Sequence, residues 1–281
     1  MAQAIGSVGF IGLGSMGGCQ ARELAKLSLP LTVFDKFPTA MEPFRGKATL
    51  AGSIADLGNC DVVGICVQDD SQVTECCDEL IPAMKPGSVI LVHSTIRPAT
   101  AKALAERAAA VGVELMDAAV TRTETTNDGP FVFCMLGGDE ATMARVQTVL
   151  DAYSTNTMLV GPLGSAMGLK ICNNLVAWSQ IMLGLEAMDL AEAAGVPLDK
   201  LIAVMRRNGV MTPTMDGFIA FRNNPGDQTQ RDLMAVQAGI GQKDLTLANE
   251  LGEAVGKPSA IGAHVKDYVK QAIIDVCRRP A

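Results

Sequence analysis

Histidine is nearly absent from this sequence, which has only two, His93 and His264, among its 281 residues. A Ser-His-Asp triad or a similar histidine-based catalytic arrangement therefore has little material to draw on. None of the eight cysteines forms a C-x-x-C pair, which argues against a zinc site and against a thioredoxin-like redox motif. Several cysteines lie inside apolar runs, as small buried hydrophobic residues do. We therefore expect a protein of the reducing cytoplasm with no metal site.

An excess of basic residues is also missing, because 23 Lys and Arg stand against 30 Asp and Glu. With a net charge of −7 and no stripe of Lys and Arg, the chain lacks the electrostatic footprint of a nucleic-acid-binding protein. No uncharged apolar run reaches the length of about 18 residues that suggests a membrane span. The N-terminal region has no basic segment, and glycines interrupt its apolar stretch, so we expect a soluble protein without a signal peptide.

Apolar residues are plentiful, since 48% of the chain is hydrophobic and 19% is charged, which is typical of a globular protein with large cores. A length of 281 residues favours two domains. Up to about residue 160, short apolar runs alternate with stretches of helical period, which predicts an α/β domain with a mostly parallel sheet covered on both faces. The expected strands are residues 7–11, 31–34, 61–67, 89–93, 113–116, 131–136 and 157–160, and expected helices include 16–26 and 98–111.

Beyond Gly161 and Pro162 the strand-like runs stop, so we expect an N-terminal domain over residues 1–162 and an all-helical domain over residues 163–281. Residues 165–194 contain no proline and predict one helix of about 30 residues, roughly 45 Å long. Such a helix, apolar around its circumference, cannot be covered by the few helices that remain in one chain, which predicts a homodimer or homotetramer. The shorter helices are expected at residues 199–207, 213–222, 239–255 and 262–278.

A glycine-rich turn follows the first expected strand and opens the first expected helix. Residues 12–17 read GLGSMG and fit the pattern G-x-G-x-x-G. The first glycine permits a tight turn, the second lets the backbone approach a pyrophosphate, and the third lets helix and strand pack closely. The turn therefore predicts a dinucleotide-binding site in a Rossmann, doubly wound domain. Its expected contacts are Gly12, Leu13, Gly14, Ser15 and Met16.

Asp35 ends the second expected strand, 18 positions beyond Gly17. A carboxylate at this place can accept hydrogen bonds from a ribose diol and would repel a 2′-phosphate, so NAD is favoured as the cofactor. The neighbouring Lys36 leaves NADP open.

Polar residues gather at the start of the long helix. Lys170 and Asn174 are four residues apart and share one helical face, with Asn173 beside them and Trp178 one turn further on. A lysine and two amides among apolar residues are costly to bury unless a polar group lies opposite them. We interpret that group as a substrate. The alternative is a lysine that reaches solvent from a polar notch between helices.

Together these motifs resemble the β-hydroxyacid dehydrogenases, which include 3-hydroxyisobutyrate dehydrogenase, tartronate semialdehyde reductase and sulfolactaldehyde reductase. The resemblance covers nearly the whole chain. The segments that carry it are GFIGLGSMG at 9–17, STI at 94–96, DAAV at 117–120, GSAMGLKICNN at 164–174 and KDLTLA at 243–248.

The resemblance implies hydride transfer between NAD or NADP and a short 3-hydroxy acid or the corresponding semialdehyde. It implies that Lys170 is the catalytic acid or base and that Asn174 orients the substrate. It places further cofactor contacts at Val67, Gln68, Thr95 and Lys243, and it gives Asp244 only a local capping or pairing role. A non-catalytic NAD-sensing protein of the same fold is the alternative from another class, although a sensor has no need of a proton donor at Lys170.

The sequence departs from the family at the expected substrate loop, which begins at Asp117. Most members have two glycines where this chain has Arg122 and Thr123. Arginine pairs bidentately with a carboxylate, sulfonate or phosphate, so Thr121, Arg122 and Thr123 are expected to hold the acid group of the substrate, with a second anionic group also possible. The Arg-Thr pair is similar to that of the sulfolactaldehyde reductases. An arginine in a surface or subunit salt bridge stays open as the alternative.

Overall fold

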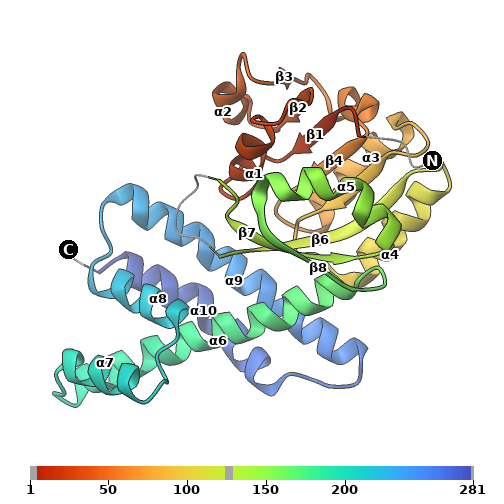
Figure 1. Cartoon of the computed structure of the whole chain (residues 1–281). Coiled ribbons are helices and arrows are strands. Elements are labelled where there is room, and N and C mark those ends of the chain that lie inside the picture. The colour runs from red at the N-terminus through yellow and green to blue at the C-terminus, as the bar shows by residue number, and fades with distance from the viewer. Residues whose placement is uncertain (1–4, 124–128, 280–281) are drawn as a thin grey trace. The chain divides into compact units, whose positions relative to one another are not determined.

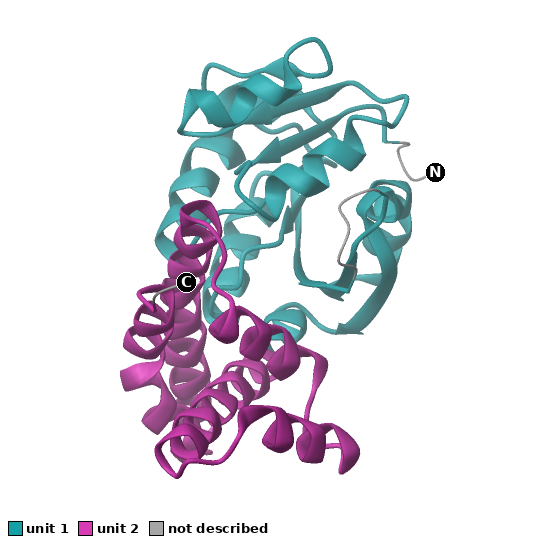
Figure 2. Ribbon diagram, turned by 90° about the vertical axis from the view of Figure 1, so that its left-hand side faces the viewer, with its two compact units in different colours: residues 1–170 teal, residues 171–281 magenta. Residues whose placement is uncertain are grey.

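The computed structural model describes residues 5–123 and 129–279 and divides into two compact units, residues 1–170 and 171–281 (Figure 2). Helix α6 (Ser165–Ala193) begins in the first unit and continues into the second. The boundary expected between residues 162 and 163 falls just before this helix, whereas the compact units divide a short way inside it. The start of α6 thus belongs with the sheet.

The first unit contains one eight-stranded sheet in the order β3-β2-β1-β4-β5-β6-β7-β8 (Figure 1). All neighbouring strands run parallel except β6 and β7, which are antiparallel. The order runs outward from β1 in both directions, so the predicted doubly wound, mostly parallel Rossmann sheet is confirmed. The strands are β1 (Val8–Ile11), β2 (Leu31–Phe34), β3 (Thr49–Leu50), β4 (Val62–Ile65), β5 (Val89–Val92), β6 (Glu114–Arg122), β7 (Val132–Gly137) and β8 (Ser154–Gly161).

Helices cover both faces of this sheet. Helices α1 (Gly17–Leu24) and α5 (Glu140–Tyr153) contribute to the core on one face. Helices α3 (Asp70–Leu80), α4 (Pro98–Ala109) and the first residues of α6 contribute to the core on the other. Because both faces are covered, the central strands β4 and β5 are buried at every residue and read as continuous apolar runs instead of alternating ones. The short helix α2 (Pro38–Met41) follows β2.

Strand β6 is the main departure from expectation in this unit. We expected a strand over residues 113–116 and a substrate loop from Asp117 to Thr123, but one strand runs from Glu114 to Arg122. Antiparallel pairing with β7 holds this extension, with Val120 opposite Cys134 and Arg122 opposite Val132. The loop prediction was wrong because these residues include β-branched side chains, which favour extended backbone, and no glycine. The two-residue strand β3 was not expected at all.

The second unit is helical, as expected. Besides the rest of α6 it contains α7 (Leu198–Arg207), α8 (Pro213–Asn223), α9 (Gln228–Ala254) and α10 (Ala260–Cys277). Helix α9 begins well before the expected residue 239, because Asp227 and Gln230 form a capping box. The Asp227 carboxylate accepts a hydrogen bond from the backbone N–H of Gln230, and the Gln230 side chain accepts one from the backbone N–H of Asp227.

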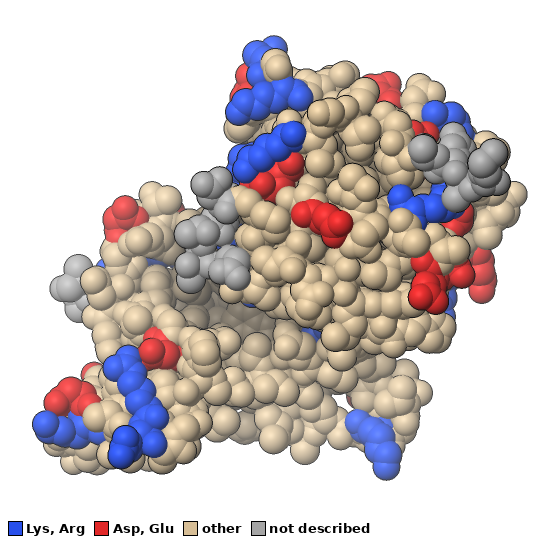
Figure 3. All heavy atoms as spheres, viewed as in Figure 1, with Lys and Arg blue, Asp and Glu red and all other residues tan. Residues whose placement is uncertain are grey.

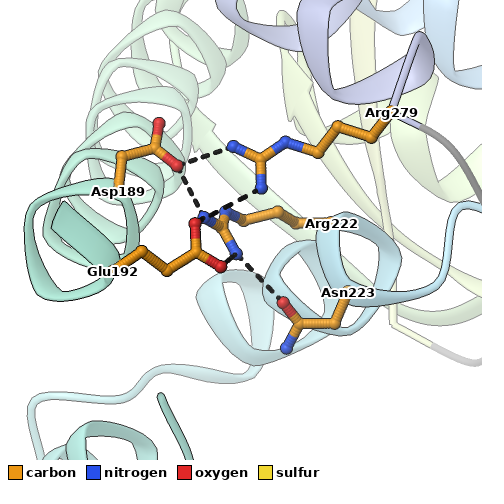
Figure 4. Close-up of polar contacts among 5 residues, drawn as sticks. All are labelled: Asp189, Glu192, Arg222, Asn223 and Arg279. Atoms are coloured by element: carbon orange, nitrogen blue, oxygen red, sulfur yellow. Dashed lines mark hydrogen bonds and ion pairs between the residues drawn. The ribbon is translucent and has the colours of Figure 1, made fainter. Parts of the chain in front are cut away.

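A buried arginine joins three segments of the second unit (Figure 4). The guanidinium of Arg222 on α8, 1% exposed, donates hydrogen bonds of 2.6 Å to Asp189 and 2.6 Å to Glu192 on α6. Arg279, just past α10, donates a further bond of 2.7 Å to Asp189. A guanidinium is tolerated at this depth because two carboxylates compensate its charge, so this network stabilises the packing of α8 and the C-terminal segment on α6.

The surface carries charges of both signs. On the face in Figure 3, the acidic and basic side chains of the described residues are interspersed over a largely uncharged surface. Among the helices of the described part of the chain, none is both long and apolar enough to cross a membrane.

His93, the residue after β5, lies inside the core of the first unit and is 3% exposed. Its Nδ1 donates a 2.7 Å hydrogen bond to the carbonyl of Ala118, its Nε2 lies 3.3 Å from the hydroxyl of Tyr153, and its ring stacks on Phe10. Burial lowers the pKa of His93 from its ordinary 6.5 to about 4, although the bond to Ala118 opposes this shift. His93 is therefore a neutral core residue beneath the carboxyl edge of the sheet.

We expect His93 to make the free energy of unfolding depend on pH. The unfolded chain protonates this histidine near pH 6.5 and the folded protein only near pH 4. Its contribution is therefore complete above pH 6.5 and is lost as the pH falls toward 4, with a slope of at most about 1.4 kcal/mol per pH unit. In urea titrations followed by circular dichroism, His93→Gln should lose less stability between pH 6.5 and 5 than the wild type.

His264→Gln is the control, because it removes the other histidine from an exposed position of α10. Equal losses in wild type and His93→Gln over this pH range would contradict the assignment.

Candidate functional site

The carboxyl ends of four strands lie in one row across the sheet, and Asp117, inside β6, continues this row. Strand pairing puts Phe34, Ile11, Ile65, Val92 and Asp117 in register on β2, β1, β4, β5 and β6. Nearly all the cofactor residues predicted in the first unit follow this row directly. The glycine turn comes after β1, Asp35 after β2, Val67 and Gln68 after β4, and Thr95 after β5. The structure therefore brings these predicted residues to one edge, where open α/β sheets bind ligands.

The glycine turn has the geometry that a dinucleotide requires. Gly12 has φ 89°, and a Cβ added to it would lie 2.3 Å from the carbonyl oxygen of Cys66. A Cβ on Gly17 would lie 2.0 Å from the carbonyl oxygen of Gly12. A Cβ on Gly14, in contrast, would meet nothing within 4 Å, so this glycine faces open space at the N-terminus of α1. A pyrophosphate can approach the backbone there and accept from its N–H groups.

Asp35 ties the end of β2 to the glycine turn. One carboxylate oxygen accepts a 2.7 Å hydrogen bond from the backbone N–H of Leu13, and the other accepts one of 2.8 Å from the N–H of Phe37. The Lys36 ammonium lies 5.2 Å from the centre of the exposed Phe37 ring. The predicted ribose-binding carboxylate therefore also has a structural task, which sequence reasoning had not assigned to it.

A serine hydroxyl links the loops after β4 and β5. Ser94 is buried, and its Oγ accepts a 2.8 Å hydrogen bond from the backbone N–H of Val67. Gln68 is exposed beside it, and Thr95 follows Ser94 directly. Ser94 is a residue that sequence reasoning used only as part of a motif. It holds the Val67–Gln68 and Thr95 segments together.

Of the three residues expected to hold the substrate, Thr121 and Arg122 end β6 and lie on opposite faces of it, and Thr123 follows the strand. Ala119 belongs to the core on the α6 side, and Ala118 and Val120 belong to the opposite core. By the same alternation, Thr121 lies on the side where α6 begins and Arg122 on the other. The structure thus groups Thr121, but not Arg122, with the start of α6.

The guanidinium of Arg122 lies over the ring of Phe131, 4.9 Å from its centre. Phe131 is fully buried, so the ring is a fixed platform for this cation. Thr123 continues the pairing, since its backbone N–H donates a 3.0 Å bond to the carbonyl of Phe131 and its hydroxyl lies 3.0 Å from that of Thr155.

A buried carboxylate on β6 anchors the start of α6. Asp117, 0% exposed, accepts hydrogen bonds of 2.8 Å from the backbone N–H of Gly164 and 2.9 Å from that of Met167. Gly164 directly precedes α6 and Met167 lies in its first turn, where N–H groups lack partners within the helix and a negative charge is favourable. Lys170 follows one turn later and is itself buried. A Cβ on Gly137, opposite in β7, would come within 2.2 Å of the carboxylate.

A second buried carboxylate gathers predicted residues in the helical unit. Asp244 on α9 accepts hydrogen bonds on one oxygen from the Asn174 amide at 2.7 Å and from the Trp178 indole N–H at 3.3 Å. The ammonium of the half-buried Lys243 lies 3.0 Å from the other oxygen. The local role expected for Asp244 was therefore too narrow, since it also joins α9 to α6. The signal available in the sequence was a charged residue at the start of the largely apolar segment DLTLA.

The described residues do not form a metal-binding cluster. Among residues 5–123 and 129–279, no group of three or more His, Cys, Asp or Glu side chains is arranged to hold an ion.

Known proteins with similar sequences identify the family of this chain. Residues 7–161 match the family model described as the NAD binding domain of 6-phosphogluconate dehydrogenase. An uncharacterized oxidoreductase of Mycobacterium tuberculosis is 34% identical over 257 residues, which cover 88% of this chain and 86% of that protein. A Dictyostelium discoideum protein named as a probable mitochondrial 3-hydroxyisobutyrate dehydrogenase is 31% identical over 267 residues, covering 91% and 82%. The chain belongs to the β-hydroxyacid dehydrogenase family.

A solved β-hydroxyacid dehydrogenase has the same architecture. The crystal structure of 3-hydroxyisobutyrate dehydrogenase from Salmonella typhimurium matches with a TM-score of 0.80 at 26% identity, covering 96% of this chain and 99% of that one. As a member of this family, the protein is an NAD(P)-binding oxidoreductase of the 3-hydroxyisobutyrate dehydrogenase type. The open space at Gly14 and the N-terminus of α1 fit the pyrophosphate of such a cofactor.

Proposed function

We propose that this protein transfers a hydride between a nicotinamide cofactor and a short 3-hydroxy acid or the corresponding semialdehyde, with Lys170 as the general acid or base. The observation that carries the proposal is the placement of Lys170. Lys170 is buried and lies one turn beyond the start of α6, which Asp117 holds through two hydrogen bonds. Asp117 is in register with Ile11, the residue directly before the glycine turn, across β5 and β4. A buried amine near the cofactor-binding edge suits proton transfer.

The chemistry divides between the cofactor and the protein. The nicotinamide ring, when bound, supplies the acceptor or donor of the hydride. Lys170 takes the proton from the substrate hydroxyl during oxidation and returns it to the carbonyl oxygen during reduction. General acid–base assistance of this kind contributes about 10²- to 10⁴-fold to the rate.

The other predicted residues bind and orient. Asn174 lies four residues beyond Lys170 on α6, and both are buried, so we assign it to the substrate oxygen. Thr121, Arg122 and Thr123 are assigned to the acid group. Lys243 is assigned to the cofactor, together with the turn at residues 12–16 and Val67, Gln68 and Thr95.

NAD is the favoured cofactor, although Lys36 leaves NADP as a second one. The Asp35 carboxylate follows β2 and would repel a 2′-phosphate on the adenosine ribose. Neither Lys36 nor Asp35 is fully buried, so both are accessible from this edge.

Arg122 favours a substrate that carries a second anionic group. Its guanidinium is held over Phe131, which lowers the entropy cost of pairing with a planar or tetrahedral anion. A sulfonate-bearing semialdehyde, as in the sulfolactaldehyde reductases, is therefore the second candidate. The reaction assigned to Lys170 is the same for both substrates.

The first prediction from this proposal concerns Lys170. Lys170→Met should lower kcat by at least about 100-fold, because it removes the proton donor, while NADH still binds. The measurement is an NADH-linked assay over a panel of short 3-hydroxy acids and semialdehydes, with NADH binding followed by its fluorescence.

Lys85→Met serves as the control for Lys170, because Lys85 pairs with Asp61 at the opposite edge of the sheet. Unchanged turnover in Lys170→Met would refute the acid–base role. NADH binding by a wild type that turns over no member of the panel would favour the non-catalytic NAD sensor.

The second prediction concerns Arg122. Arg122→Met keeps a long side chain on Phe131 but removes the charge. The kcat/KM for substrates with a second carboxylate or a sulfonate should fall by about tenfold or more, with a smaller effect on substrates that carry a single acid group. Arg107→Met, which removes an exposed arginine paired with Asp78, is the control. If Arg122→Met ranks the panel as the wild type does, Arg122 does not select the substrate.

We also propose a homodimer or homotetramer in the cytoplasm. Large apolar side chains recur every seventh residue along α6 and are exposed by 41, 54, 59 and 71% at Leu169, Val176, Leu183 and Leu190. Such spacing makes one stripe that a second copy can cover. Leu183→Glu should reduce the mass measured by light scattering, and Val111→Glu, at the end of α4, should not. A monomeric wild type would contradict the proposal.

A further inference from the structure

Asp244 is a buried carboxylate with an unusual set of neighbours. It is 2% exposed, and a negative charge at this depth is stable only when donors compensate it. The Asn174 amide and the Trp178 indole N–H donate to one oxygen, and the ammonium of Lys243 forms an ion pair with the other. Two of the three, Asn174 and Lys243, are residues assigned above to substrate and cofactor. One carboxylate therefore contacts both a residue assigned to the substrate and a residue assigned to the cofactor.

The carboxylate determines which way the Asn174 amide points. An ionised carboxylate can only accept, so the group that Asn174 turns toward it must be the NH₂. The carbonyl oxygen of Asn174 accepts a 3.2 Å bond from the Asn173 amide. Because both ends of the amide are engaged, its orientation is defined without a ligand. A second N–H of the same NH₂ group is left to donate to a substrate oxygen.

A glycine lets the two helices approach closely at this point. Gly241 lies one turn before Asp244 on α9, and a Cβ added to it would lie 3.0 Å from ring carbons of Trp178. The indole therefore rests directly on the α9 backbone, with its N–H on the carboxylate. This packing fixes Asp244 against α6 independently of any bound molecule.

We propose that Asp244 is a positioning residue of the reaction, which orients the Asn174 amide and holds the Lys243 ammonium for the substrate-binding and cofactor-binding roles proposed for them above. The inference rests on the function proposed above. Asp244 acts through its neighbours and touches neither the substrate nor the cofactor. Its two oxygens divide the task, because one serves Asn174 and Trp178 and the other serves Lys243.

This division makes two substitutions informative in different ways. Asp244→Asn keeps one carbonyl oxygen, which can still accept from Asn174 and Trp178, but its NH₂ cannot accept from an ammonium. It should raise the KM for the cofactor by about tenfold and leave the KM for the substrate within about threefold. Asp244→Leu removes both acceptors and should raise both KM values by about tenfold or more.

Trp178 supplies a readout that does not depend on turnover. It is the only tryptophan in the chain, so the intrinsic emission of the cofactor-free protein reports on the indole beside Asp244. Both substitutions should shift the emission maximum, because each removes a negative charge near the indole ring. Trp178→Phe removes one donor and keeps the ring packing, and should change either KM by less than about threefold.

Asp189→Asn is the matched control. It also removes a carboxylate of the helical unit, but from the Arg222 and Arg279 network (Figure 4). It should lower thermal stability without changing either KM or the emission of Trp178.

The outcomes separate this inference from the proposed function. A wild type with no activity on any hydroxy acid or semialdehyde would overturn the function, whatever the emission spectra show. In an active enzyme, unchanged KM values in Asp244→Asn would overturn the positioning role. Equal rises in both KM values with Asp189→Asn would do so as well, because the effect would then reflect general destabilisation. If Asp244→Leu does not fold, Asp244→Asn alone decides.

Discussion

The arrangement of the first unit depends on one buried carboxylate meeting the first turn of one helix. Asp117 lies on β6 in register with the residues that precede the cofactor-binding loops, and it accepts hydrogen bonds from Gly164, just before α6, and from Met167 in its first turn. A carboxylate with no exposed surface needs donors, and a helix start has donors without partners. The carboxylate thus gains hydrogen-bond donors, and the N–H groups at the helix start gain an acceptor. Lys170 consequently has a defined distance along the helix from the carboxyl edge of the sheet, and α6 belongs with the sheet up to this residue.

Much of the fold could be predicted from the sequence, because its signals are local. The glycine turn after β1, the apolar runs of β4 and β5 and the absence of proline from α6 each act over a few residues, and the sheet and the long helix formed where they were expected. The start of α9 was missed because its cap, Asp227, precedes a polar stretch without apolar period. The extension of β6 was missed because expectation followed the glycine-rich loop of relatives, whereas Val120 and Thr121 favour a strand.

The candidate site was only partly predictable. Residues that follow parallel strands must gather at one edge, so the glycine turn and Asp35 could be named from their positions. Val67 and Thr95 were expected only from the resemblance to the family. Asp117 and Asp244 could not be given their roles in this way, because their hydrogen-bond donors lie 47 to 70 residues away in the chain. Local periodicity carries no information about such pairs. In the sequence, both residues stand out only as parts of the DAAV and KDLTLA motifs, which do not name the groups that neutralise a buried acid.

The double engagement of Asp35 has a consequence for the evolution of cofactor use. Its carboxylate holds the N–H of Leu13 inside the glycine turn as well as the N–H of Phe37. Exchanging it for a neutral or basic residue to admit an extra phosphate would also release the loop that must cradle the diphosphate. A substitution of Asp35 that admits NADP would therefore also weaken the binding of the diphosphate that NAD and NADP share. Substitution of the Lys36 or Phe37 side chain would change the surroundings of the ribose without removing the hydrogen bond from Leu13 to Asp35. Evolution of a different cofactor preference would therefore disturb the glycine turn less at these two positions.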